Sequence, residues 1–292
     1  MHELLQTSIN GLSIGSIYAL AAIGLTLVYG ILKLVNFAHG DFMTLGAYVA
    51  FAVNVSADLP LALAVAAALA AVALMGLSFE YAIWRPMRNR GAGMLQLLLM
   101  SLGLAFVIRY LIQFQWGGQS QKLNVDTLQA WHPFDLTISR IQVIVIVSAG
   151  VLLTVVALLL KTSTLGKSMR ALSDNFDLAE VSGIDTGRVI AVTWLVAGGL
   201  AGLSGVFAAI YQTTFDSETG FRLLLSVFAA VILGGIGSAY GALAGGILIG
   251  LVQEWSTMFV SPTYKEAVGF LVLILVLLIR PQGIFGRAVR TA

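Results

Sequence analysis

Long apolar stretches alternate with short polar segments along almost the whole chain. A hydrocarbon core of about 30 Å needs about 20 apolar residues in helical conformation, and most of these stretches approach that length. The predicted membrane helices are Ile9–Val28, Phe42–Val55, Leu61–Phe79, Met94–Phe114, Ile141–Leu160, Ile190–Tyr211 and Ala267–Ile279. The pattern therefore indicates an all-α, polytopic membrane helix bundle.

The apolar stretch Leu223–Val252 differs from the others because Gly234-Gly235-Ile236-Gly237-Ser238 interrupts it. Its length is too great for one ordinary span and short for two. Three glycines in four residues should break a helix. We therefore predict two short or re-entrant half-helices that meet at the glycines. The whole chain, residues 1–292, is then a single transmembrane domain of about eight spans with broken or re-entrant helices.

A second polar interruption, Asn36–Asp41, lies between the first two apolar stretches. Polar groups at membrane depth usually face a cavity, a partner or the water interface. The candidate pathway residues are therefore Asn36, His39, Gly40, Asp41, Gly234, Gly235 and Gly237. Two alternatives remain open, since Asn36 or Asp41 could instead cap the next helix, and the glycines could serve close packing.

Composition narrows the class of protein and its chemistry. The chain is 59% hydrophobic and 10% charged, whereas soluble domains carry about 25% charged residues. The absence of cysteine excludes disulfides and thiolate metal sites. No metal-ligand spacing, catalytic motif or basic run for nucleic acid occurs, and Gly166-Lys167-Ser168 lacks the earlier glycine of a phosphate-binding loop. We therefore expect a non-catalytic chain with no cofactor of its own.

Lysine and arginine predict the orientation. The segments Glu80–Gly93, Lys161–Arg188 and the C-terminal tail hold ten of them, and the alternate segments hold four. Positive residues favour the cytoplasmic side, so we expect the N-terminus outside and the C-terminus in the cytoplasm. The longest external loop, Gln115–Arg140, could hold a strand pair. Arg109, inside a span near its outer end, is expected to snorkel to the interface.

The polar segment at residues 161–188 is the longest one on the predicted inner side. Met169, Leu172, Phe176 and Ala179 are spaced to share one face of a short helix, which Gly183 could terminate. Such an apolar face needs a place to dock. A cytoplasmic partner is one candidate, and the chain's own spans or the lipid surface are the alternatives.

Five motifs occur in order along nearly the full length of the chain. They are Gly11-x-x-x-Gly15-x-x-Tyr18-Ala19-Leu20 with Leu27-Val28-Tyr29-Gly30; Val35-Asn36-Phe37-Ala38-His39-Gly40-Asp41; Leu165-Gly166-Lys167 through Ala179-x-x-x-Gly183-Ile184; Val231-x-Leu233-Gly234-Gly235-Ile236-Gly237-Ser238; and Arg280-Pro281-x-Gly283-Ile284-x-Gly286. Together they resemble the LivH-type permeases of branched-chain amino acid ABC importers.

This resemblance implies a set of partners in a bacterial or archaeal cell (inner) membrane. They are a second, LivM-type permease, two cytoplasmic subunits that bind ATP and Mg, and an extracytoplasmic substrate-binding protein. It also implies that Asp174–Gly183 lies in the coupling region. The candidate ATPase-coupling residues are Arg170, Leu172, Asp174, Phe176, Ala179, Glu180 and Gly183.

The expected function is thus a permease subunit that imports branched-chain or related hydrophobic amino acids by alternating access, with energy from the ATPases. A permease for urea or short amides is an alternative, because related permeases use a similar scaffold. An ion-coupled secondary transporter or a passive channel is another. The former would need buried ionisable groups, and apart from His39, Asp41 and Arg109 the spans have almost none.

Overall fold

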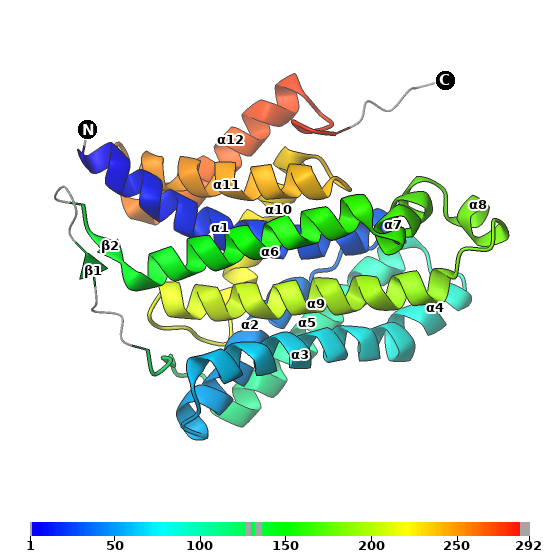
Figure 1. Cartoon of the computed structure of the whole chain (residues 1–292), viewed down its shortest axis with the longest axis horizontal. Helices are drawn as coiled ribbons and strands as arrows, with labels where there is room; N and C mark the ends of the chain where they lie inside the picture. Colours follow the sequence, from blue (N-terminus) through cyan, green and yellow to red (C-terminus); the bar gives the residue numbers. More distant parts are fainter. Residues whose placement is uncertain (1, 126–129, 132–135, 287–292) are drawn as a thin grey trace.

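The computed structural model describes residues 2–125, 130–131 and 136–286. Its helices are α1 (His2–Leu32), α2 (His39–Phe51), α3 (Leu61–Phe79), α4 (Arg85–Asn89), α5 (Met94–Trp116), α6 (Arg140–Thr162), α7 (Thr164–Asp174), α8 (Phe176–Val181), α9 (Thr186–Tyr211), α10 (Thr219–Gly234), α11 (Ala239–Ser256) and α12 (Lys265–Ile279) (Figure 1). Among the described residues, six helical segments are long and apolar enough to cross a membrane, and α10 is a shorter apolar helix. The predicted helical membrane bundle is confirmed.

Two helices, α1 and α9, form the centre of the bundle. Both are apolar around their whole circumference, which is typical of helices enclosed by other helices. The most apolar part of α1 is almost completely buried, whereas α3, α6 and α12 turn most of their surface outward. The helix α1 packs on α11 through glycines, and a Cβ atom on Gly15 would lie 3.0 Å from the Cα atom of Ile247. Small residues therefore bring these two backbones together.

The order of a long helix, a non-helical segment, a short helix and a third helix occurs twice. The first set is α1, α2 and α3, and the second is α9, α10 and α11. Each long helix packs against the third helix of the other set, and α2 and α10 contact each other. Figure 1 shows α1 and α9 side by side and running in opposite directions. The two short helices therefore meet near the middle of the bundle.

The interrupted stretch after α9 forms two helices, as predicted. The break lies at residues 235–238, between α10 and α11, and Gly235 and Gly237 adopt φ angles of 99° and 89°. The left-handed region is accessible to glycine without steric cost. Two short helices were predicted here. Only α10, with 16 residues, is short, whereas α11 has 18 residues. The strand pair is also present, with β1 (Ala130–Trp131) antiparallel to β2 (Ile138–Ser139).

The prediction of one helix across Met169–Ala179 is wrong. The segment forms two helices, α7 and α8, because Asn175 adopts an extended conformation between them. The Oδ1 atom of Asn175 accepts a hydrogen bond from the backbone N–H of Leu178 at 3.0 Å, which caps α8. Asparagine favours such local bonds over a helix interior. Gly183, with a φ angle of 84°, ends α8 as expected.

Candidate functional site

The polar segment before α2 lies inside the bundle and its backbone is held by α5. Ser101 of α5 accepts a hydrogen bond from the N–H of Phe37 and donates one to the carbonyl of Val35, both at 3.1 Å. Non-helical backbone in a membrane needs such partners. Asn36 and His39 are almost completely buried. The segment is therefore enclosed by the chain's own helices in this conformation.

Asn36 and His39 make different contacts. The Oδ1 atom of Asn36 accepts a hydrogen bond from the N–H of Ala38 at 3.1 Å, just before α2 begins. Its Nδ2 atom has no hydrogen-bond partner among the described residues. The Nε2 atom of His39 lies 3.0 Å from the carbonyl oxygen of Ala21 in α1. Asn36 thus accepts a hydrogen bond just before α2, and its buried Nδ2 donor has no partner among the described residues.

Arg109 does not snorkel to the interface. Its Nε and Nη2 atoms donate to Asp41 at 2.9 and 3.2 Å, and its side chain is only 9% exposed. The Phe221 ring of α10 lies 4.2 Å from the guanidinium carbon. A buried carboxylate without a partner is costly, so Asp41 holds the arginine inside. Asp41 is consequently a partner for Arg109 rather than a cap of α2.

Asp41 and Arg109 were both visible in the sequence as ionisable groups within spans. Charged groups in membrane spans usually pair with one another. Their opposite signs were therefore a signal that would have predicted the pair.

Gly40 lies where the two short helices cross. A Cβ atom on Gly40 would lie 2.6 Å from the carbonyl oxygen of Gly220, the second residue of α10. Thr44 joins the same contact, because its Oγ1 atom accepts a hydrogen bond from the N–H of Gly220 at 3.0 Å. Because Gly40 has no side chain, α2 and α10 approach each other closely at this point in this conformation.

The break between α10 and α11 packs against the end of the described chain. The N–H groups of Ile284 and Phe285 donate to the carbonyls of Leu233 and Gly234 at 2.8 and 3.1 Å. A Cβ atom on Gly235 would lie 2.8 Å from the Cα atom of Gly286. The free carbonyls at the end of α10 thus find partners, and the alternative of close packing fits Gly234 and Gly235.

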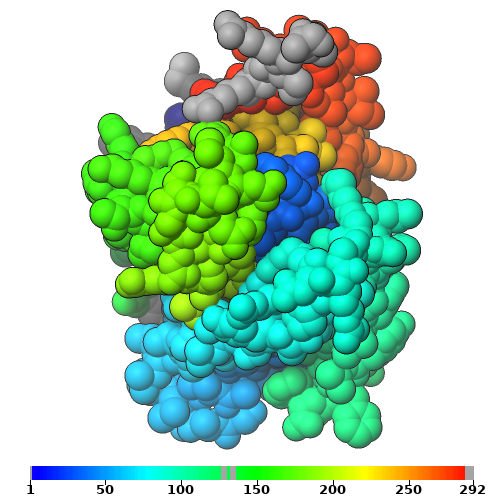
Figure 2. All heavy atoms as spheres, turned by 90° about the vertical axis from the view of Figure 1, so that its right-hand side faces the viewer, coloured from blue at the N-terminus to red at the C-terminus, as the bar shows by residue number. Residues whose placement is uncertain are grey.

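A cavity of about 440 Å³ lies at the end of the bundle that carries α7 and α8. Residues from the end of α1, from α7, from the break and from residues 285–286 line it, including Lys33, Arg170, Asp174, Gly237, Ser238 and Tyr240. Figure 2 looks onto this end, where α7 and α8 protrude beside the end of α1. The cavity therefore brings Gly237, from the pathway set, close to Arg170 and Asp174 from the coupling set.

Lys33 connects α1 to α7 at this cavity. Its Nζ atom donates to the carbonyls of Gly30 and Ser173 at 2.9 and 3.3 Å. Its backbone has a φ angle of 50°, which is uncommon for a residue with a side chain. The chain leaves α1 at this point and turns toward Asn36. Lys33 therefore ties the end of α7 to the chain just before Asn36.

The apolar face predicted for docking is mostly used inside the chain. Met169, Leu172 and Ala179 are buried, and Phe176 is partly buried. The exposed apolar side chains of α8 are Leu178 and Val181, which are 60% and 81% exposed. Asp174, Glu180 and Gly183 lie on the exposed surface near them. Most of the predicted apolar face thus packs on the chain's own helices, which was the alternative. The apolar surface that α8 exposes consists of other residues, Leu178 and Val181.

Known proteins resemble this chain over almost its whole length. A family model described as "Branched-chain amino acid transport system / permease component" matches residues 7–277. The permease protein LivH of the high-affinity branched-chain amino acid transport system of Escherichia coli (strain K12) is 32% identical over 97% of this chain and 96% of its own length.

The corresponding protein BraD of Pseudomonas aeruginosa is 32% identical over 98% of this chain and 97% of its own length. A probable LivH from Methanocaldococcus jannaschii is 30% identical over 93% and 89%. No solved structure matches the chain. The full-length matches and the helical membrane bundle agree, and the chain belongs to the family of permease components of branched-chain amino acid transport systems.

Proposed function

We propose that this chain is the membrane permease of an ATP-driven importer for branched-chain or related hydrophobic amino acids. Its relatives carry names of that transport system. Two cytoplasmic ATP-binding subunits supply the energy, and their ATP and Mg are the only cofactors. A second, LivM-type permease completes the pathway, and an extracytoplasmic binding protein delivers the amino acid. The chain itself carries out no chemical reaction.

The observation that carries this proposal is the exposed apolar surface of α8, at the same end of the bundle as the cavity. Val181 is 81% exposed, and exposed apolar surface rimmed by polar residues is typical of an interaction site. Asp177 and Glu180 supply that polar rim. An ATPase docked here moves α8 and α7 together. The bonds of Lys33 then pass the motion to the end of α1 and to the segment before α2.

Transport requires α2 and α10 to separate where they cross, because the residues at this crossing are enclosed in the present conformation. The free Nδ2 donor of Asn36 is then available to a substrate carboxylate. His39, Gly40 and Asp41 follow directly in the same segment, and Gly237 lines the cavity at the other end of α10. We infer that the amino acid passes between the Asn36–Asp41 segment and the break after α10 by alternating access.

The docking part is tested by Val181→Asp in the complex purified from its native cells in mild detergent. We expect the ATP-binding subunits to be lost and leucine uptake to stop, because a carboxylate replaces the apolar contact. Val260→Asp is the matched control, since Val260 is exposed near the end of α11 opposite the break. Unchanged subunit recovery in Val181→Asp would contradict the proposal.

The orientation is tested with single cysteines, since the chain has none of its own. Ser182→Cys and Ser261→Cys are both at exposed positions. A membrane-impermeant thiol reagent added to intact cells should label position 261 and leave position 182 unlabelled until the membrane is opened. The reverse labelling would place α8 outside and contradict ATPase docking there. Competition of leucine uptake by isoleucine, valine and urea then identifies the substrate class.

A further inference from the structure

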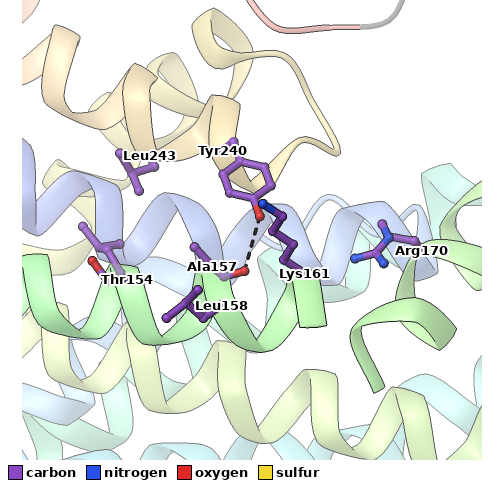
Figure 3. Close-up of a pocket in the computed structure, with 8 residues that line it drawn as sticks. Thr154, Ala157, Leu158, Lys161, Arg170, Tyr240 and Leu243 are labelled. Carbon is purple, nitrogen blue, oxygen red and sulfur yellow. Dashed lines mark hydrogen bonds between the residues drawn. The ribbon is translucent and has the colours of Figure 1, made fainter. Parts of the chain in front are cut away.

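A second hollow lies on the side of the bundle, between α6 and α11. Its volume is about 610 Å³, and its lining residues are Leu153, Thr154, Ala157, Leu158, Lys161, Arg170, Tyr240 and Leu243. The helix α6 packs along α1 but touches α11 at few positions, so an open groove lies between α6 and α11. Figure 3 shows this groove with α6 below it and Tyr240 and Leu243 above it. We call it the α6–α11 groove.

The two ends of the groove differ in chemistry. Leu153, Leu158 and Leu243 make its length apolar. At the other end, Lys161 of the last turn of α6 points toward the Tyr240 hydroxyl, and Arg170 lies beyond it (Figure 3). None of the described residues that line the groove is acidic. The groove is therefore apolar along its length and cationic at one end.

Local contacts hold the groups at the cationic end. The Tyr240 hydroxyl donates a hydrogen bond to the carbonyl of Ala157 at 3.3 Å, across the groove. The Arg170 guanidinium donates to the carbonyl of Leu160 at the end of α6. In the described part of the chain, no carboxylate forms an ion pair with Lys161. Its ammonium group is available to an anion.

The position of the groove matches one leaflet of a bilayer. Lys161 ends a helix of 23 mostly apolar residues, which places its ammonium group at the membrane–water interface. From Leu153 to Lys161 the helix rises by about 12 Å. One leaflet contributes about 15 Å of hydrocarbon. An acyl chain lying in the groove would thus have its headgroup beside Lys161.

We propose that the α6–α11 groove binds an anionic phospholipid, with an acyl chain along α6 and the phosphate between Lys161, Arg170 and the Tyr240 hydroxyl. Basic pockets between membrane helices attract anionic headgroups. A neighbouring protein helix fits less well, because it would have to cover two cations and would need acidic residues of its own. The lipid joins α6, α7 and α11 at the end of the bundle that carries α8.

The test uses the full chain with its co-purifying partners, reconstituted in phosphatidylcholine vesicles that contain either photoactivatable phosphatidylglycerol or photoactivatable phosphatidylcholine. Mass spectrometry then maps the cross-linked peptides. We expect phosphatidylglycerol to label peptides at residues 153–161 and 240–243 at least about fivefold more than phosphatidylcholine. That ratio corresponds to about 1 kcal/mol for one lysine near the headgroup, at 1.4 kcal/mol per tenfold change.

Two variants and two matched controls make the test specific. Lys161→Gln should lower labelling by phosphatidylglycerol about fivefold by removing that attraction, and Ala157→Phe should abolish groove labelling by filling it. Lys167→Gln removes the same charge on α7, and Val155→Phe introduces the same aromatic ring on α6, but neither residue lines the groove. Both controls should label as the unaltered chain does. Lys161 is exposed, so its variant should keep the fold.

Three outcomes would overturn the proposal. Equal labelling by the two lipids would identify only general contact with the bilayer. Labelling by phosphatidylglycerol that survives Lys161→Gln would exclude the headgroup site. A photo-cross-linker attached to Thr154→Cys that captures the second permease instead of lipid would show that the groove is a protein interface.

Discussion

The ion pair between Asp41 and Arg109 leads to the sharpest stability prediction. Replacing Arg109 by methionine leaves the Asp41 carboxylate, which is fully buried, without its cation. Removing one partner of a buried pair typically costs about 3 to 5 kcal/mol. The two hydrogen bonds at 2.9 and 3.2 Å and the Phe221 ring at 4.2 Å give this pair good geometry. We expect a loss of about 3 kcal/mol for Arg109→Met and for Asp41→Asn.

The assay is a double-mutant cycle, with the free energy of unfolding measured by denaturant titration of the purified chain in detergent. The double variant has neither charge, so it should cost at least about 2 kcal/mol less than the sum of the single variants. Arg222→Met is the matched control, because Arg222 pairs with Asp216 at 2.7 Å but its side chain is 48% exposed. That exposed pair should be worth less than about 1 kcal/mol.

Additive costs in the cycle would refute the reasoning, since independent sites add. A loss for Arg222→Met as large as that for Arg109→Met would also refute it. Burial would then not be the property that makes the Asp41 pair strong.

Further predictions concern the glycines and the half-buried carboxylate of Asp216. Gly40→Ala should lower the free energy of unfolding by about 1 to 3 kcal/mol, because its Cβ atom would lie 2.6 Å from a carbonyl of α10, whereas Gly103→Ala, with open space around its Cβ atom, should cost nothing. Gly235→Ala should speed hydrogen exchange at the N–H groups of residues 284–285, because the φ angle of 99° and the contact with the end of the chain both disfavour a side chain. Burial alone would raise the pKa of Asp216, but hydrogen bonds from an arginine and from backbone and threonine donors outweigh it, so this pKa lies below its ordinary value. Its stabilising effect is therefore complete above pH about 4 and is lost at lower pH, and Asp216→Asn should remove this part of the acid dependence of unfolding.

The long helices could be predicted from the sequence because membrane thickness imposes a length that few other structures require. The break at Gly234–Gly237 was predictable for a similar reason, since glycine is a poor helix former. The division between α7 and α8 was missed. Apolar spacing continued across Asn175, and the tendency of asparagine to cap a following helix was the signal that pointed to two helices.

The candidate site was located by the sequence only in part. The polarity of Asn36–Asp41 marked a special segment, but its partners come from α1, α5 and α10, far along the chain. Packing against distant helices decides which polar group faces which neighbour, and periodicity carries no information about it. The exposed face of α8 was misjudged for the same reason, because α7 and α8 bury the apolar residues that the spacing selected.

The hydrogen bonds from Ile284 and Phe285 to the end of α10 have a consequence for the making of the protein. The ribosome completes α10, α11 and α12 before it releases these two residues, because synthesis runs from the N-terminus. During synthesis the carbonyls of Leu233 and Gly234 therefore lack these two donors until residues 284–285 have been added. A product that ends after α12 would contain all of the described helices and still lack these two hydrogen bonds, so the glycine turn after α10 would be left without its packing partner.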